Sequence, residues 1–241
     1  MINKLIDIIK SSNNIVFLGG AGVSVESGIP DFRSSTGIYS EEYTYPAEKI
    51  LSHNFFFEKT KEFYEFYKKK MLYLDAKPND CHKTLAYLEK IGKLKAIITQ
   101  NIDNLHNEAG SKKVYEIHGS VMSNHCIRCN KFYDVNYIAK SNDIPKCDCG
   151  GIIKPDVVLY DENLDRNMII DSINYISTCD TLIIGGTSLT VYPAAGFVEY
   201  FNGKNLVIIN KSVSSYDNRA NLVINDDIGK VFKQVYDYFN E

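Results

Sequence analysis

Four of the chain's six cysteines fall in one short stretch, and their spacing makes it the first candidate for chemistry. They are arranged as Cys126-x-x-Cys129 and Cys147-x-Cys149 within residues 124–151. Two close pairs of thiolates can form a tetrahedral zinc site with four cysteine ligands, although the second pair is one residue tighter than usual. A redox site and a pair of disulfides are the alternatives. The redox site is disfavoured because it needs a thioredoxin-like strand–helix context that this stretch lacks.

Zinc is therefore the favoured interpretation, and a structural role is expected of it. Four thiolates would fill the coordination shell and leave no open position for water or substrate. Gly150 and Gly151 are expected to bend the chain so that the tight second pair can reach a common centre. The two remaining cysteines, Cys81 and Cys179, are expected to be buried packing residues.

A glycine-rich turn follows the first apolar run of the chain. In "FLGGAGVSVESG", Gly20 and Gly22 come directly after an expected strand. Glycines in such a turn let the backbone approach a phosphate and leave N–H groups free to bind it. The match to the dinucleotide fingerprint is partial, because Val25 stands where the third glycine belongs. A second glycine-rich strand end at 183–189 favours a nucleotide site over an ordinary turn.

Polar side chains crowd the end of another expected strand, in "TQNIDNLHNEAG". Gln100, Asn101, Asp103 and His106 stand there, and such groups line sites more often than cores, although Asn101 or Asp103 could cap the loop. His118, in "YEIHGS", titrates in the range that suits a general base, but a lone histidine is more often structural. The residues alone leave both interpretations open.

Composition limits the classes of protein that the chain can represent. It has 241 residues, 44% of them hydrophobic, and a net charge of −3 from 27 basic and 30 acidic side chains. These values indicate one medium domain with a possible insert, and they do not favour nucleic acid as a partner. No signal peptide or membrane helix is recognisable. A cytoplasmic protein is expected, where thiols stay reduced, which further disfavours disulfides.

Strand and helix signals alternate along most of the chain. Short apolar runs that match buried parallel strands occur at 14–20, 94–100, 180–189, 204–210 and 220–225. Helical spacing or capping residues mark 3–12, 53–71 (one or two helices), 79–92, 164–177, 193–201 and 227–240. This order predicts an α/β fold with a doubly wound parallel sheet. The cysteine stretch interrupts the pattern and is expected to form a small inserted module.

In combination, these motifs resemble those of the sirtuins, which are NAD-dependent protein lysine deacylases. The motifs are "GAGVSVESGIPDFR", "TQNIDNLHNEAG", "HG" at 118–119, the four cysteines and "GTSLTVYPAA", in the order found in that family. The resemblance covers nearly the whole chain and is closest to bacterial members. It implies a Rossmann-like NAD-binding domain of residues 1–34, 76–120 and 155–241. The smaller domain would combine a helical part, 35–75, with a zinc module, 121–154.

The resemblance also implies a role for individual residues. The catalytic residues would be His118, Asn101 and Asp103. NAD would be bound by Gly20, Ala21, Gly22, Val25, Phe32, Arg33, Gln100, Asn101, Ile102, Asp103, His118, Gly186, Thr187, Ser188, Asn210, Asp227 and Ile228. The acyl-lysine peptide would lie as a strand against Val157, Val158, Tyr160, Leu189 and Val191. One structural zinc ion would be held by Cys126, Cys129, Cys147 and Cys149.

The implied reaction is removal of acetyl groups from protein lysines, with release of nicotinamide and O-acetyl-ADP-ribose. The acetyl oxygen would attack the ribose carbon that bears nicotinamide, Phe32 would shield that carbon, and His118 would act as base on a ribose hydroxyl. A Tyr-x-x-Arg pair marks relatives that prefer succinyl or malonyl groups, and here Tyr64 is followed by Tyr67 in the arginine position. Uncharged acyl groups are therefore expected.

Two other functions remain as alternatives, namely mono-ADP-ribosyl transfer and non-catalytic NAD sensing. The expected partners are acetyl-lysine proteins, without membrane or nucleic acid, and the chain is expected to act as a monomer. One local departure from the family concerns the substrate segment, because Tyr160-Asp161-Glu162 stands where Phe-Gly-Glu is common.

Overall fold

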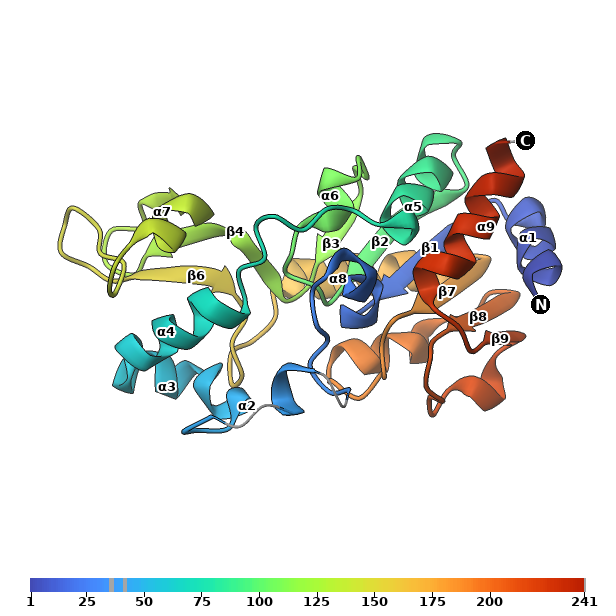
Figure 1. Cartoon of the computed structure of the whole chain (residues 1–241). Helices are drawn as coiled ribbons and strands as arrows, with labels where there is room; N and C mark the ends of the chain where they lie inside the picture. The colour runs from blue at the N-terminus through green and yellow to red at the C-terminus, as the bar shows by residue number, and fades with distance from the viewer. Residues whose placement is uncertain (35–36, 41–42, 241) are drawn as a thin grey trace.

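The computed structural model describes residues 1–34, 37–40 and 43–240, and it contains two lobes (Figure 1). The large lobe is built on a six-stranded parallel sheet of order β3-β2-β1-β7-β8-β9. Its strands are β1 (Ile15–Gly19), β2 (Leu94–Thr99), β3 (Val114–Glu116), β7 (Thr181–Gly185), β8 (Asn205–Ile209) and β9 (Leu222–Ile224). The fold is therefore the predicted doubly wound, Rossmann-like α/β fold with a smaller inserted domain.

Helices cover both faces of this sheet, which explains why its central strands are apolar throughout. Alternate β1 side chains enter two separate cores, Ile15 and Phe17 on one face and Val16 and Leu18 on the other. The first face is covered by α1 (Ile2–Ser11), α5 (Asp80–Lys90) and α9 (Ile228–Asn240), which lie together at the upper right of Figure 1. The second is covered by α8 (Arg166–Thr178) and the 3-10 helix η4 (Ala194–Tyr200). A strand that is buried on both faces does not alternate between apolar and polar residues.

The sheet register brings three strand ends to one edge. Gly19 of β1 pairs with Thr99 of β2 on one side and with Gly185 of β7 on the other. The residues that follow these strands therefore meet at the carboxyl edge of the sheet, where ligands of open α/β folds bind.

The small lobe has its own sheet and its own core. Its strands are β4 (Gly119–Cys126), β5 (Phe132–Asp134) and β6 (Ile153–Val157), in the antiparallel order β5-β4-β6. Its helices are α2 (Ala47–Ile50), α3 (His53–Glu58), α4 (Thr60–Lys70) and α7 (Val135–Lys140). The core is rich in aromatic rings, with Phe56, Phe63, Tyr64 and Tyr67 at most 2% exposed. Residues from the helical segment and from the cysteine segment pack together in this core.

The remaining short elements lie in turns. In the large lobe they are α6 (Leu105–Glu108) and the 3-10 helices η1 (Ala21–Val23), η2 (Val25–Ser27) and η5 (Asp217–Arg219). The 3-10 helix η3 (Ile38–Ser40) packs on the small-lobe core through Ile38. The predicted α-helix at 193–201 is instead the 3-10 helix η4. Its ends are closed by i→i+3 hydrogen bonds, from Gly196 N to Pro193 O and from Phe201 N to Val198 O. Within the described residues, no helix is long and apolar enough to cross a membrane.

Two buried histidines pack against each other beneath the first face of the sheet. The rings of His82 and His106 lie 4.7 Å apart and steeply inclined to each other, and both residues are at most 2% exposed. Burial, with Lys83 nearby, lowers the pKa of His82 to about 4. Burial, with His82 nearby, also places the pKa of His106 well below its ordinary range. Both rings are therefore neutral in the folded protein at neutral pH.

This histidine pair predicts a loss of stability in acid. The unfolded chain takes up protons near pH 6.5 that the folded rings refuse, so stability is full above that pH and falls as pH drops toward the folded pKa. His106→Phe keeps an aromatic ring and removes one titrating group. Below pH 6.5, the free energy of unfolding, measured in urea, falls as the pH drops. We expect this fall to be smaller in the variant than in the wild type by about 1.4 kcal/mol per pH unit. Parallel losses in the two proteins would contradict this assignment.

Candidate functional site between the two lobes

A cavity of about 1050 Å³ lies at the carboxyl edge of the parallel sheet and reaches into the small lobe. Every residue predicted to contact NAD lines it, from the glycine-rich turn to Asp227 and Ile228. Of the predicted peptide contacts, Val157, Val158, Tyr160 and Val191 also line it. Leu189 does not, because its side chain is 4% exposed and packs in the core. The expected contact of the Leu189 side chain with a peptide is therefore wrong.

His118 is held in one tautomer by the end of β2. Its Nδ1 lies 3.1 Å from the backbone carbonyl oxygen of Gln100. A carbonyl oxygen can only accept, so Nδ1 must carry the proton and Nε2 is left as a basic lone pair. Burial lowers the pKa of His118, and the hydrogen bond to Gln100 offsets part of that effect. The ring is therefore a neutral base on the wall of the cavity.

A buried polar cluster lies beside the histidine. Asn101 donates from Nδ2 to Ser24 Oγ (3.0 Å), and Ser24 Oγ donates to Asp103 Oδ2 (2.6 Å). The second oxygen of Asp103 accepts from Leu105 N at 2.9 Å. Burial raises the pKa of Asp103, against the effect of the bonds from Ser24 and Leu105. Ser24 was missed from sequence, although its place inside the glycine-rich turn motif was a usable signal.

The two glycine-rich turns pack directly on each other. A Cβ on Gly22 would lie 2.7 Å from Gly186 Cα, which is too close for any side chain. Gly22 N donates to Gly186 O (2.8 Å), and Gly20 N donates to Gly185 O (3.2 Å). The expectation that these N–H groups stay free for a phosphate is therefore wrong. Both glycines are required because the turns from β1 and β7 meet backbone to backbone.

The second turn is fixed from two neighbouring strands. Asn210, after β8, accepts from Thr187 N (3.1 Å) and donates to Thr187 O (2.9 Å). Gln100, after β2, donates from Nε2 to Thr187 Oγ1 at 3.0 Å. Further along the cavity, Asp227 forms an ion pair with Lys211. The predicted residues of this end thus form one connected wall.

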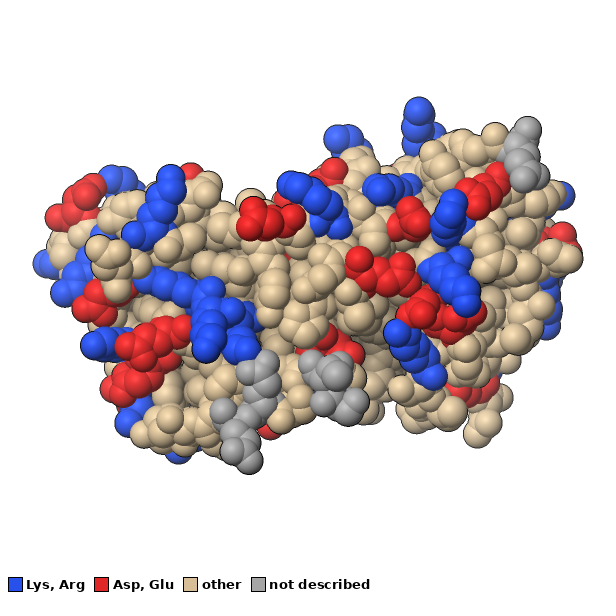
Figure 2. Space-filling view, in the orientation of Figure 1, with Lys and Arg blue, Asp and Glu red and all other residues tan. Residues whose placement is uncertain are grey.

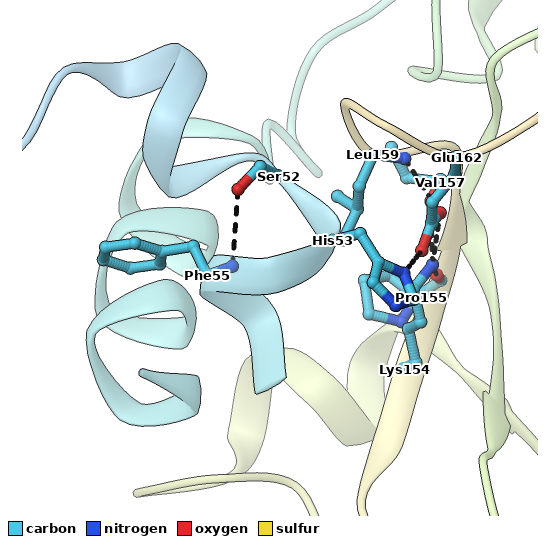
Figure 3. Close-up of polar contacts among 8 residues, drawn as sticks. All are labelled: Ser52, His53, Phe55, Lys154, Pro155, Val157, Leu159 and Glu162. Atoms are coloured by element: carbon cyan, nitrogen blue, oxygen red, sulfur yellow. Dashed lines mark hydrogen bonds and ion pairs between the residues drawn. The ribbon is translucent and has the colours of Figure 1, made fainter. Parts of the chain in front are cut away.

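The predicted peptide segment 157–162 is bonded to His118 and to the small lobe. Val158 N donates to the backbone oxygen of His118 at 2.9 Å. Figure 3 shows the carboxylate of Glu162, which accepts from His53 Nδ1 (2.9 Å), Lys154 Nζ (2.9 Å) and Leu159 N (3.0 Å). Burial raises the pKa of this carboxyl, but the three donors outweigh it and lower the pKa.

Asp161 adopts a backbone conformation that is typical of glycine. Its φ is +71°, in the left-handed region that glycine adopts without strain and that aspartate tolerates better than most residues. The substitution of glycine by aspartate in the Tyr160-Asp161-Glu162 motif therefore preserves the local backbone turn.

The four clustered cysteines face one another at the far end of the small lobe. Their sulfurs all lie within 4.8 Å of one another, and Sγ–Sγ distances of 3.5 Å join Cys126 to Cys149 and Cys129 to Cys147. A tetrahedral zinc ion with Zn–S bonds of about 2.3 Å needs sulfurs about 3.8 Å apart, whereas a disulfide needs about 2.05 Å. The sulfurs therefore fit zinc, and all six cysteines of the chain are free thiols.

The glycines after the tight pair close this site as expected. Gly150 has φ +81°, and the turn is closed by bonds from Gly150 N to Cys147 O and from Cys147 N to Gly151 O, both 2.8 Å. A Cβ on Gly151 would lie 2.6 Å from Cys126 Sγ. No other group of three or more potential ligands occurs in the described part of the chain.

Fold, cavity and cysteine cluster together define an α/β nucleotide-binding protein with a structural zinc module. The model of the Sir2 family matches residues 20–193, and the chain belongs to that family. A protein of Clostridium perfringens named "NAD-dependent protein deacetylase" is 60% identical over 240 residues, which is 98% of each chain.

Solved structures of Sir2 proteins have the same fold. One, with a deacetylated p53 peptide and 3′-O-acetyl ADP ribose, has a TM-score of 0.91 and 39% identity, over 98% of both chains. Another, with a p53 peptide and NAD+, has a TM-score of 0.89 and 39% identity, over 100% of this chain and 99% of the other.

The zinc site predicts dependence of the fold on metal. Because the cysteines and the helical segment contribute to one core, removing zinc is expected to unfold the small lobe and abolish activity. Elemental analysis should find about one zinc per chain in the wild type and in the control Cys179→Ala, and less than about a tenth of that in Cys129→Ser. A chelated, metal-free protein that stays folded and active would refute the structural role.

Proposed function

We propose that this protein removes acetyl groups from protein lysines with NAD as co-substrate, and releases nicotinamide and O-acetyl-ADP-ribose. The observation that carries the proposal is the His118–Gln100 hydrogen bond, which fixes the proton on Nδ1 and leaves Nε2 as the basic nitrogen on the wall of the interlobe cavity. A protein that only senses NAD has no use for a base at this position. Family membership and the names of close relatives support the same activity.

The cavity fits NAD in size and in the chemistry of its lining. A volume of about 1050 Å³ suits a dinucleotide with room for a lysine side chain. Gly20, Ala21 and Gly22 would border the pyrophosphate, and Phe32 and Arg33 the nicotinamide ribose. Gln100, Ile102 and Asp103 would face the ribose hydroxyls and carboxamide. Gly186, Thr187, Ser188, Asn210, Asp227 and Ile228 would bind the adenosine end, with Val25 beside them.

When bound, NAD supplies a ribose carbon that is activated by its nicotinamide leaving group. His118 accepts a proton at Nε2 from a ribose hydroxyl and so makes that oxygen nucleophilic. Asn101 orients a water and the ribose, and Asp103, fixed by Ser24, binds the carboxamide. Phe32 covers the reacting carbon and keeps bulk water away.

The substrate is proposed to bind as an added strand between 157–162 and 188–193. Backbone hydrogen bonds would supply affinity with little sequence preference. Side chains of Val157, Val158, Tyr160 and Val191 would contact the peptide. This position brings the acyl-lysine into the cavity next to His118, since Val158 is bonded to the His118 carbonyl.

Several features outside the reaction centre belong to the same proposal. The zinc ion would be held by the four clustered cysteines and would act only through structure. The proposed division is 1–34, 76–120 and 155–241 against 35–75 and 121–154. The small-lobe core joins the last two ranges and continues through β6 to Val157 and Leu159, slightly past the proposed boundary. We also propose a cytoplasmic monomer that does not bind nucleic acid. Figure 2 shows acidic and basic side chains interspersed on the visible face, without a large field of one sign.

The acyl group is proposed to be acetyl or another uncharged acyl. Tyr64 and Tyr67 are both buried, with Tyr64 Oη bonded to the carbonyl of Ile153 and the Tyr67 ring stacked on Phe63. Lys68 Nζ is engaged by Ser141, at 2.6 Å from its carbonyl oxygen. None of these groups lines the cavity.

Cations do line other parts of the cavity. Arg33 is paired with Glu48 (3.8 Å) and Lys211 with Asp227, while the Nζ of Lys70 lies 5.8 Å from the centre of the Tyr43 ring. A lysine binds a carboxylate less well than the bidentate fork of an arginine. Dicarboxylic acyl groups are therefore disfavoured.

The test is a panel of one peptide carrying acetyl-, propionyl- or succinyl-lysine, incubated with enzyme and NAD and followed by mass spectrometry. We expect acetyl and propionyl peptides to yield free lysine, nicotinamide and the acylated ADP-ribose in equal amounts. The succinyl peptide should react with kcat/KM at least about tenfold lower, because Tyr67 stands where the arginine that pairs with such a carboxylate would be. Transfer of ADP-ribose to protein without loss of acetyl would instead support the ADP-ribosyltransferase alternative.

A further inference from the structure

Two tyrosines from different walls of the cavity meet hydroxyl to hydroxyl. Tyr39 Oη and Tyr160 Oη lie 2.6 Å apart, and both residues line the cavity. Tyr39 belongs to the segment that carries Phe32 and Arg33, whereas Tyr160 belongs to the proposed peptide segment. The hydrogen bond therefore joins the cofactor side of the site to the peptide side.

Tyr39 is closely connected to the residues proposed to cover the nicotinamide ribose. Its N–H donates to Phe32 O at 2.9 Å, and its ring packs edge-on against the Phe32 ring at 5.5 Å. The guanidinium carbon of Arg33 lies 5.5 Å from the centre of the same ring. Any displacement of Tyr39 would therefore move Phe32 and Arg33 with it.

Tyr160 is fixed from the opposite direction. Its N–H donates to Leu51 O and its carbonyl accepts from His53 N, both at 2.9 Å, so its backbone is bound to the small lobe. Two residues along, Glu162 is held by the side chains of His53 and Lys154 (Figure 3). Because its backbone is anchored in this way, the Tyr160 hydroxyl can serve as a fixed point for Tyr39.

We infer that Tyr160 is a positioning residue: its hydroxyl holds Tyr39, and through Tyr39 it holds Phe32 and Arg33 in the arrangement that binds the nicotinamide ribose. This inference rests on the proposed function. A phenylalanine at the same position, as in the Phe-Gly-Glu motif, has no hydroxyl and could not make this bond. The hydrogen bond thus couples the peptide segment to NAD binding in this chain through one oxygen pair.

The test is a double-mutant cycle with Tyr160→Phe, Tyr39→Phe and the double variant. Tyr87→Phe is the matched control, because it removes a hydroxyl that donates to Phe239 O at 3.0 Å, outside the interlobe cavity. The affinity for NAD is measured by calorimetry without peptide. Steady-state kinetics with an acetyl-lysine peptide then give KM for NAD and kcat.

Each cavity variant is expected to weaken NAD binding about three- to tenfold, the effect of one lost hydrogen bond. The double variant should lose no more than either single variant, since both remove the same bond. KM for NAD should rise by a similar factor, and kcat at saturating NAD should stay within about twofold of the wild-type value. Tyr87→Phe should change neither KM nor kcat.

An NAD affinity of Tyr160→Phe equal to that of Tyr87→Phe would overturn the inference, as would losses that multiply in the double variant. If the wild type binds NAD but frees no lysine, the proposed function fails while the calorimetric cycle still decides the inference. If the wild type does not bind NAD, both fail.

Discussion

The hydrogen bond between His118 Nδ1 and the Gln100 carbonyl is the interaction on which the proposed chemistry depends. It selects the tautomer that leaves Nε2 as the basic nitrogen, while burial keeps the ring neutral by lowering its pKa. Gln100 can present that carbonyl only because β2 lies beside β1, with Thr99 paired to Gly19. Gln100 N in turn donates to Gly19 O at 3.0 Å, which continues the ladder past the end of β2. The state of the base is therefore a consequence of sheet register.

A second constraint is that the site has walls from both lobes. The large lobe supplies the turns after β1, β2, β7 and β8, and the small lobe supplies the anchor points of segment 157–162. The small lobe in turn has one core, to which helices α2–α4, the cysteine module, Val157 and Leu159 all contribute. The zinc ion would therefore stabilise the same core that supports segment 157–162. A zinc ion far from the reacting atoms can matter for catalysis in this way.

Much of this arrangement could be predicted from sequence, because the signals were local. Continuous apolar runs marked the parallel strands, cysteine spacing marked the zinc site, and polar residues after strands marked the cavity. The two glycine turns were recognised, but the purpose of their glycines was not, since the contact of Gly22 with Gly186 joins residues far apart in the chain. Leu189 was placed in the site although its side chain turns into the core.

Other parts of the site depend on tertiary contacts that no local pattern encodes. Ser24 joins Asn101 to Asp103 across 77 and 79 residues of sequence, and Tyr39 meets Tyr160 across 121. His106 was expected to line the site, but the structure buries its ring against that of His82. Spacing along the chain says nothing about such pairs, which become visible only when the sheet assembles.

The most direct test of the account is the pH profile of kcat/KM for an acetyl-lysine peptide, with His118→Gln as the companion variant. Because burial lowers the pKa of His118, the base is unprotonated at neutral pH and is lost only as pH falls through that lowered pKa. The account predicts a flat profile from about pH 7 to 8.5, a decline below about pH 6.5, and at least about a hundredfold loss in His118→Gln at every pH. A rate that keeps climbing above pH 8, or a folded His118→Gln that retains substantial turnover, would contradict it.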